Sequence, residues 1–230
     1  MSDAIGVVAA HPDDEVLGCG GTLARMASEG RAVHILLISD GQTSRAIEAG
    51  QPPVEDVLKA RNVAARAACE ILRGSSVEVL GLPDNRLDGV ELLDVVKHIE
   101  SFVRRRRPSL LLTHHCGDVN IDHRVVHDAV ISACRPQPGY PVKELLFFEV
   151  PSSTEWRPGS AATAFCPNYF VDISATLPKK LEALNAYAAE LRPFPHPRSI
   201  KAVTALAHWR GATVGVEAAE AFMLGRKLVD

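Results

Sequence analysis

The sequence has few of the features that mark secreted, membrane or nucleic-acid-binding proteins. Its five cysteines are odd in number, scattered and without a Cys-x-x-Cys pair, so they predict free thiols in a reducing cytoplasm. The segment Met1–Ala4 has no basic residue and no apolar run reaches the length of a membrane span, so we expect neither a signal peptide nor a transmembrane helix. A formal net charge of −3 gives no electrostatic reason to expect nucleic acid or a membrane surface as partner.

The pattern of apolar segments predicts a single α/β domain over residues 1–230. Hydrophobic residues make up 47% of the chain, enough for a sizeable core, and there is no internal repeat or linker. Short β-branched segments alternate with amphipathic ones, which predicts a Rossmann-like, mostly parallel sheet with helices on both faces. Right-handed crossovers in such a doubly wound sheet favour a strand order near 3-2-1-4-5.

The expected elements follow from local composition. Strands are expected at residues 5–10, 33–38, 77–80, 109–113, 143–150 and 169–173, and residues 220–224 are interpreted as an edge strand. Helices are expected at residues 22–30, 54–73, 87–107, 124–134, 177–191 and 200–211. The small residues of Gly18–Gly21 are interpreted as allowing close helix–sheet packing, because they do not match a dinucleotide-binding motif. The arginines Arg104–Arg107 are interpreted as the basic end of a helix before Pro108.

A dense polar cluster, His11-Pro12-Asp13-Asp14-Glu15, stands where the first predicted strand ends. An imidazole and three carboxylates at the mouth of a buried strand are costly to desolvate unless they have partners. His11 and Asp14 form a nitrogen–oxygen ligand set that suits a divalent metal such as zinc, and Asp13 beside them could act as a general base. The alternative is an ordinary helix N-cap with acidic first-turn residues.

A second polar cluster follows the predicted strand at 109–113. Strands one and four are neighbours in the predicted order, so their carboxyl ends and both clusters should meet at one crevice. A later histidine would complete a three-ligand site of the catalytic type, which leaves one position open for water. We predict His123 as this ligand, with Asp122 before it to orient a ring, and His127 as the alternative.

These residues resemble those of a known family. The string from Ala10 to Glu15 after strand one, with Asp122-His123 after strand four, is similar to that of the PIG-L/LmbE-like zinc-dependent N-acetylglucosaminyl deacetylases. The resemblance implies zinc (Zn²⁺) on His11, Asp14 and His123, with Asp13 as general base. It also implies a substrate contact at Arg61, and a small amino sugar or glycoconjugate, carrying the N-acetyl group, as substrate.

Asn120 departs from the family pattern, which often has a histidine at that position. An amide can donate a hydrogen bond to an oxyanion but cannot carry a proton near neutral pH, so Asp13 could serve as both base and acid. The stiff segment Pro193–Pro197 contains His196, which we name as a further catalytic candidate. Asp84, in the polar turn after the third strand, is predicted to contact substrate.

Two other functions remain open from the sequence. Two histidines and one carboxylate also suit a non-haem iron enzyme, although here the two ligands of the first loop are three residues apart. A nucleotide- or sugar-binding module without catalysis would need the acidic turn only as a helix cap. The sequence leaves the acyl group, the sugar and the oligomeric state open, a homo-oligomer included.

Overall fold

The structure is a computed structural model that describes residues 4–42 and 54–229. The last part of the predicted polar loop at 39–45 and the predicted break at 50–53 therefore lie outside the described residues. No helix within the described ranges is both long and apolar enough to cross a bilayer. All five cysteines are free, as the sequence predicts.

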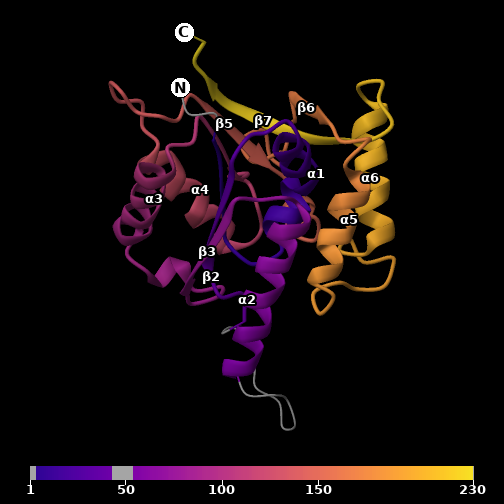
Figure 1. The fold of residues 1–230 in the computed structure, drawn as a ribbon, viewed down its shortest axis with the longest axis horizontal. Coiled ribbons are helices and arrows are strands. Elements are labelled where there is room, and N and C mark those ends of the chain that lie inside the picture. The colour runs from indigo at the N-terminus through magenta and orange to yellow at the C-terminus, as the bar shows by residue number, and fades with distance from the viewer. Residues whose placement is uncertain (1–3, 43–53, 230) are drawn as a thin grey trace.

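One seven-stranded sheet forms the centre of the molecule, with strand order β3-β2-β1-β4-β5-β7-β6 (Figure 1). The first five strands are parallel, and their order confirms the predicted 3-2-1-4-5. The strands are β1 Ile5–Ala9, β2 Val33–Ser39, β3 Ser76–Leu82, β4 Leu110–His114, β5 Glu144–Phe148, β6 Tyr169–Asp172 and β7 Ala219–Lys227.

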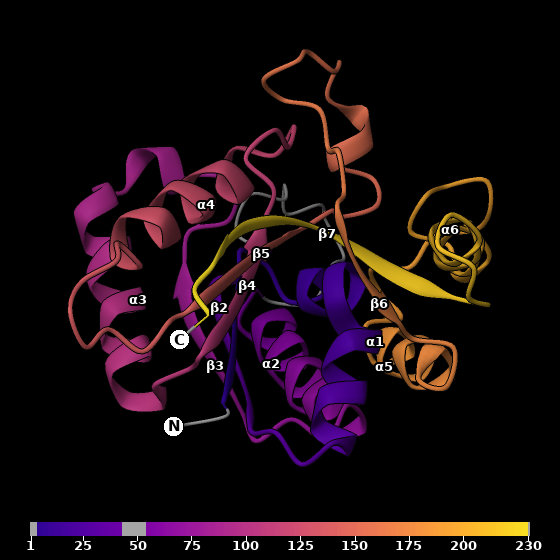
Figure 2. The same ribbon diagram turned by 90° about the horizontal axis from the view of Figure 1, so that it is seen from above.

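Helices cover both faces of this sheet, as predicted. Figure 2 shows α3 and α4 on one face, and α1, α2 and α5 on the other. The helices are α1 Asp14–Ser28, α2 Val54–Ile71, α3 Leu92–Arg106, α4 Ile121–Ala133, α5 Leu177–Ala186 and α6 Ile200–Ala212. Short 3-10 turns lie at Leu87–Gly89 and Thr154–Trp156.

Each face of the sheet has its own hydrophobic core. Along β1, Val7 packs into the core under α1 and α2, whereas Val8 packs into the core under α3 and α4. Both faces of β1 are therefore buried, which explains why its sequence is a continuous apolar run rather than an alternating one.

The position of the last strand was predicted wrongly. The segment expected to be an edge strand is β7, which lies inside the sheet and pairs antiparallel with both β5 and β6. Its first half is buried, from Ala219 to Phe222, because strands cover it on both sides. The edge strand at this end of the sheet is β6.

Helix α1 begins earlier than predicted, at Asp14, and contains a kink at Cys19. The glycines around the kink allow the close packing that their size suggests. A Cβ atom at Gly18 would lie 2.3 Å from the ring of Phe148 on β5, and one at Gly21 would lie 2.7 Å from Ile173. The early start of α1 places the acidic cluster directly on the first turn of a helix.

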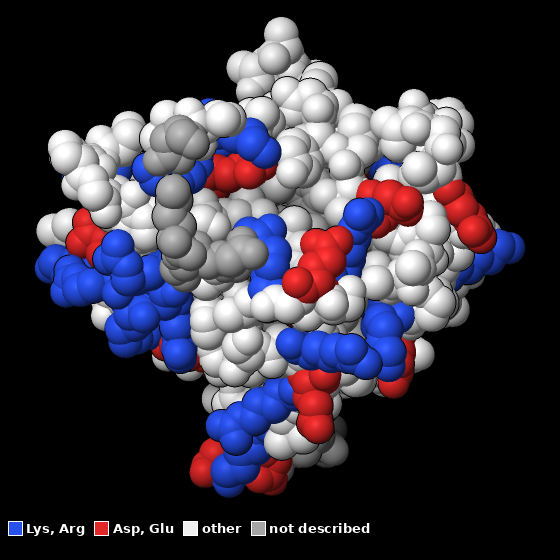
Figure 3. All heavy atoms as spheres, turned by 45° about the horizontal axis from the view of Figure 1, so that its top comes forward, with Lys and Arg blue, Asp and Glu red and all other residues white. Residues whose placement is uncertain are grey.

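Charges of both signs are interspersed over much of the surface. On the face drawn in Figure 3, acidic and basic side chains alternate, apart from one basic cluster at the left edge. The exposed arginines at the end of α3 include Arg105, which pairs with Glu78 on β3. This arrangement agrees with the interpretation of that run as the basic end of a helix.

Candidate active site

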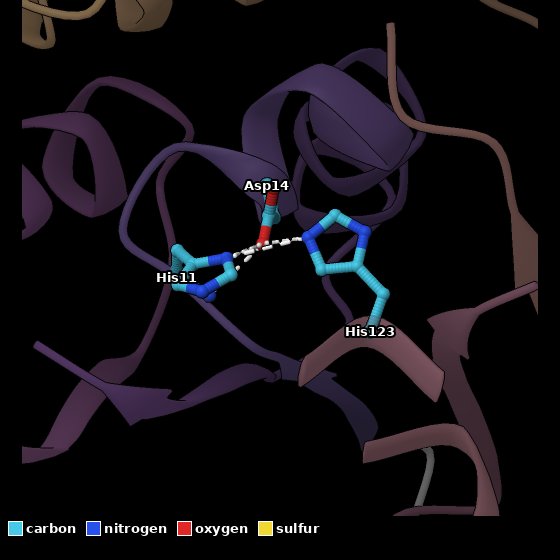
Figure 4. A group of neighbouring side chains, drawn as sticks. All are labelled: His11, Asp14 and His123. Atoms are coloured by element: carbon cyan, nitrogen blue, oxygen red, sulfur yellow. Dashed lines mark hydrogen bonds and ion pairs between the residues drawn. The ribbon is translucent and has the colours of Figure 1, made fainter. Parts of the chain in front are cut away.

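The two predicted clusters meet at the carboxyl ends of β1 and β4. These strands pair in parallel, Val7 opposite Leu112, so the segments that leave them begin side by side. His11 follows β1, Asp14 opens α1, and His123 lies in the first turn of α4. Figure 4 shows the two imidazole rings pointing at the Asp14 carboxylate from opposite sides.

The geometry of these three side chains fits a metal ion. The Asp14 Oδ2 atom lies 3.1 Å from His11 Nδ1 and 3.2 Å from His123 Nε2, and the two nitrogens are 3.3 Å apart. Metal–ligand distances near 2.0–2.2 Å in a tetrahedral site place donor atoms roughly 3.3 Å from one another. The other carboxylate oxygen, Asp14 Oδ1, is buried with no hydrogen-bond partner among the described residues. A cation here would satisfy an oxygen that otherwise has none.

The electrostatics of the cluster also favour positive charge. Burial alone would raise the pKa of Asp14, but the charge and hydrogen bonds of His123 and His11 hold it well below its ordinary value. Burial lowers the pKa of His123, yet Asp14 and Asp118 together raise it to about 9. The carboxylates thus stabilise protons on the two imidazoles, and a divalent cation would replace that positive charge.

Asp122 has a different partner from the one predicted. It does not orient the adjacent His123; its Oδ2 atom lies 3.1 Å from His11 Nε2. Asp122 is itself held by the backbone N–H groups of Asn85 and Leu87, at 2.7 and 3.0 Å. Because α4 turns the two neighbouring side chains in different directions, Asp122 fixes the ring of His11 instead.

The carboxylate that orients His123 is Asp118, which the sequence reasoning missed. Its Oδ2 atom lies 3.1 Å from His123 Nδ1 and accepts a 2.7 Å hydrogen bond from Thr154, while Oδ1 accepts one from Ser153. These contacts hold the pKa of Asp118 below its ordinary value despite burial. Each of the two histidines therefore has a carboxylate at its second ring nitrogen, and His11 Nε2 has two, since Asp84 Oδ1 also lies 3.1 Å from it. Such contacts are a common device for fixing metal-binding imidazoles.

His127, the alternative third ligand, is not part of the cluster. Its Nδ1 atom donates a 2.8 Å hydrogen bond to the backbone carbonyl of His114, and its ring packs against Phe147. The structure thus brings His123, rather than His127, to His11 and Asp14.

Asp13 stands beside the cluster with its carboxylate turned elsewhere. It occupies the N-cap position of α1, but its side chain makes no capping hydrogen bond, in contrast to the ordinary N-cap considered from the sequence. The Oδ2 atom of Asp13 instead lies 3.0 Å from the guanidinium of Arg198. Burial raises the pKa of Asp13 to about 6, even though Arg198 opposes this shift. A carboxylate with a pKa near 6 suits a general base near neutral pH.

A polar pocket of about 80 Å³ opens beside His11 and Asp13. It also contains Arg61 and Asp84, the two residues predicted to contact substrate, and Asn120. The structure adds two acid–base partners that the sequence reasoning missed: Glu190, paired with Arg61, and Arg198. The lining residues are His11, Asp13, Gly41, Arg61, Asp84, Asn85, Asn120, Glu190 and Arg198.

Asn120 lies at the pocket wall, and its side-chain oxygen and one of its two side-chain N–H groups are already hydrogen-bonded. Its side-chain oxygen caps α4 by accepting from the N–H of Asp122 at 2.8 Å. Its nitrogen donates to Asn85 Oδ1 at 3.0 Å, which leaves this amide one further N–H to offer. The cap orients the amide group so that its nitrogen, and not its oxygen, is available at the pocket.

His196 does not line this pocket, contrary to its expected place at the site. Its Nδ1 atom accepts a 3.1 Å hydrogen bond from the N–H of Arg198, and its ring packs edge-on against Trp156. The proline-rich segment does reach the site, but the side chain that it delivers there is Arg198. The proline-rich pattern predicted His196 at the site, whereas Arg198, two residues later, is the residue that contacts Asp13.

The chain is similar to several known proteins. A 4-oxalmesaconate hydratase from Pseudomonas putida is 30% identical over 201 residues, which cover 80% of this chain and 72% of that protein. A diacetylchitobiose deacetylase from Thermococcus kodakarensis is 28% identical over 189 residues, covering 78% and 67%. The crystal structure of the conserved protein TT1542 from Thermus thermophilus is 28% identical, with a TM-score of 0.76, covering 100% of this chain and 97% of that one.

The family assignment rests on the segment that carries the site. The family model described as PIG-L, GlcNAc-PI de-N-acetylase, matches residues 6–134, which is more than half of the chain. This segment includes His11, Asp14 and His123, and so confirms the resemblance seen in the sequence. The chain belongs to the PIG-L family of de-N-acetylases, enzymes that hydrolyse carbon–nitrogen bonds outside peptides.

Proposed function

We propose that this protein is a zinc-dependent deacetylase that removes the N-acetyl group from an amino sugar or sugar conjugate and releases acetate and a free amine. The observation that carries the proposal is the cluster of His11, Asp14 and His123, whose donor atoms lie 3.1–3.3 Å apart, with Asp13 beside it turned toward Arg198. A relative named for the deacetylation of diacetylchitobiose supports a sugar substrate.

His11 Nδ1, His123 Nε2 and a carboxylate oxygen of Asp14 would hold the metal. Two nitrogens and one oxygen are a typical ligand set for catalytic zinc. When bound, zinc supplies a Lewis acid that acidifies water and polarises an amide carbonyl. Asp122 and Asp118 keep the two rings in the required orientation.

Asp13 takes the proton from the attacking water. Its carboxylate faces the pocket because Arg198 holds Oδ2 at 3.0 Å, and its raised pKa makes it a better base than an ordinary exposed aspartate. The N–H of Asn120 that points away from Asn85 donates to the developing oxyanion. His11 contributes the only imidazole among the described pocket residues, and its nitrogens face other partners. Asp13 therefore also returns the proton to the leaving nitrogen.

The pocket suggests where each part of the substrate binds. The pocket of about 80 Å³ lies directly beside His11 and Asp13, so we place the acetamide group of the substrate there. Arg61 and Asp84, in the pocket wall, would contact the hydroxyl groups next to the amide.

The free thiols support a location in the reducing cytoplasm.

Acetate release tests the proposal directly. Purified protein, a metal-stripped sample and samples reloaded with zinc or ferrous iron should be assayed against free, nucleotide-linked and lipid-linked N-acetylglucosamine. We expect one equivalent of acetate per amine formed, loss of activity on stripping, and recovery with zinc. Recovery with iron alone would favour the iron enzyme, and a folded protein that binds neither metal would favour a binding module. Water addition to 4-oxalmesaconate without acetate release would instead place the chain with its hydratase relative.

A further inference from the structure

The backbone of Asp13 adopts an unusual conformation. Its φ angle is 117° with ψ of −28°, well beyond the left-handed region that aspartate tolerates in turns. Such a conformation costs free energy and persists only where neighbouring groups hold it in place. The backbone N–H groups of Val16 and Leu17 donate hydrogen bonds to the Asp13 carbonyl, but these contacts do not hold the backbone N–H of Asp13.

The N–H side of Asp13 is held by Glu15. The Glu15 Oε2 atom accepts the Asp13 N–H at 3.1 Å, and Oε1 accepts the hydroxyl of Tyr187 at 2.6 Å. Tyr187 directly follows α5 as its C-cap residue, more than 170 residues along the chain from Glu15. Both side chains are almost completely buried, Glu15 at 1% and Tyr187 at 3% exposure. A short chain of hydrogen bonds thus runs from α5 through Glu15 to the backbone of Asp13.

Glu15 has no other visible task in the site. It is not one of the three metal-binding side chains and it does not line the pocket. A buried carboxylate is expensive unless its hydrogen bonds serve a purpose. At the start of α1 it reaches back to the backbone N–H of the N-cap residue, as the acidic side chain of a capping box does, while the Asp13 side chain is turned to Arg198 and caps nothing.

We infer that Glu15 and Tyr187 are positioning residues that hold Asp13 in its strained conformation, so that its carboxylate faces the pocket and the proton it must accept. The inference rests on the proposed function, since it assumes that Asp13 is the base. Removing the hydroxyl of Tyr187 frees the Glu15 carboxylate, and Asp13 then relaxes toward an ordinary cap. Misplacement of a catalytic group by about 1 Å can cost roughly 100-fold in rate.

The experiment uses Tyr187→Phe and Glu15→Gln in the full chain. Tyr187→Phe removes one hydroxyl, and Glu15→Gln keeps the side-chain volume but offers one acceptor oxygen in place of two. We expect kcat to fall roughly 10- to 100-fold in each, with bound metal unchanged and KM changed less than about 2-fold. Tyr140→Phe is the matched control, because Tyr140 also donates a short hydrogen bond, 2.7 Å, to the carbonyl of Ala133 away from the site. Its kcat should not change.

A double-mutant cycle with Asp13→Asn separates positioning from general damage. If Glu15 and Tyr187 act through Asp13, adding either substitution to Asp13→Asn should change residual single-turnover rates less than about 2-fold. Multiplicative loss in the double mutants, or a Tyr187→Phe that behaves like Tyr140→Phe, would overturn the inference. Full turnover in Asp13→Asn would overturn the proposed role of Asp13 itself. If Tyr187→Phe fails to fold, Glu15→Gln and its double mutant provide the same test.

Discussion

Asp13 and Asp14 are identical residues one position apart, yet their surroundings give them opposite properties. Asp14 is surrounded by two imidazoles, which hold its pKa well below the ordinary value, so it stays charged and suits a cation. Burial raises the pKa of Asp13 to about 6, so it can exchange a proton near neutral pH. The local environment, rather than residue type, therefore suits Asp14 to the proposed role of metal ligand and Asp13 to the proposed role of base.

We expect Asp13→Asn and Asp14→Asn to fail in different ways. Asp13→Asn should retain a full equivalent of zinc and lose roughly 10²–10⁴-fold in kcat, because an amide cannot accept the proton from water. Asp14→Asn should lose zinc affinity first, with activity partly restored at high zinc concentration. Metal content by plasma mass spectrometry and acetate release would be measured on the same samples. Equal loss of metal in the two variants would make Asp13 a ligand.

Asp118→Asn tests the residue that orients His123. We expect zinc affinity to fall roughly 10- to 100-fold, the usual effect of losing a carboxylate that orients a metal-binding histidine. Competition with a zinc chelator measures this affinity. Asp128→Asn is a suitable control, because Asp128 is exposed on the same helix as His123. Unchanged affinity in Asp118→Asn would leave Asp118 with only a role in binding Ser153 and Thr154.

Sequence reasoning at this scale identified residues that lie in strong local patterns. His11, Asp13 and Asp14 stand in one string directly after a strand, so their meeting could be foreseen from the chain alone. The positions of Asp118 and Arg198 at the site could not be predicted, because each lies in a loop whose path depends on tertiary contacts. Arg198 reaches Asp13 across 185 positions in the sequence, and only the fold shows which side chain of its loop points inward.

At the scale of elements, helix α1 depends on a buried ion pair. The carboxylate of Glu220 on β7 accepts the N–H groups of Gly21 and Thr22 at 2.9 and 2.7 Å, just after the kink at Cys19. Lys180 on α5 lies 2.5 Å from the same carboxylate and also donates to the carbonyl of Leu17. Glu220 thus caps the second half of α1, while Lys180 compensates its charge.

We predict that Glu220→Ala lowers the free energy of unfolding by about 3–5 kcal/mol, because it leaves Lys180 buried without its partner. Denaturant unfolding followed by circular dichroism would measure the change. Lys179→Ala provides the comparison on the same helix: its pair with Glu182 is about half exposed, so its loss should cost less than about 1 kcal/mol. A similar small loss in both variants would show that the buried pair contributes no more than a surface one.

The boundaries of elements were less predictable than their order. The alternation of apolar and amphipathic segments, together with the handedness of crossovers, was enough to place β1 beside β4. The backbone N–H groups that follow the kink in α1 are capped by Glu220 on β7, and the interior place of β7 depends on its pairing with β5 and β6. Neither contact is visible in the local sequence, because tertiary packing decides that β7 lies antiparallel between β5 and β6.

For the molecule as a whole, we predict that removal of metal abolishes activity but not the fold. Two hydrophobic cores, one on each face of the sheet, support the structure without His11, Asp14 and His123. The apoprotein should keep its far-ultraviolet spectrum and a cooperative thermal transition, at a somewhat lower midpoint because bound metal stabilises the native state. A chelated sample with the spectrum of an unfolded chain would show that the site is structural.

The interior place of β7 has a consequence for how the protein is made. Ribosomes extend chains from the N-terminus, and the candidate metal ligands His11, Asp14 and His123 all precede β6 and β7 in the sequence. The segment that supplies Tyr187, Glu190 and Arg198 is held between β6 and β7, and β6 gains its place in the sheet by pairing with β7. A nascent chain that has not yet released β7 could thus gather metal ligands before it has a positioned base. Acquisition of metal and onset of activity would then be separate events in the life of each molecule, in that order.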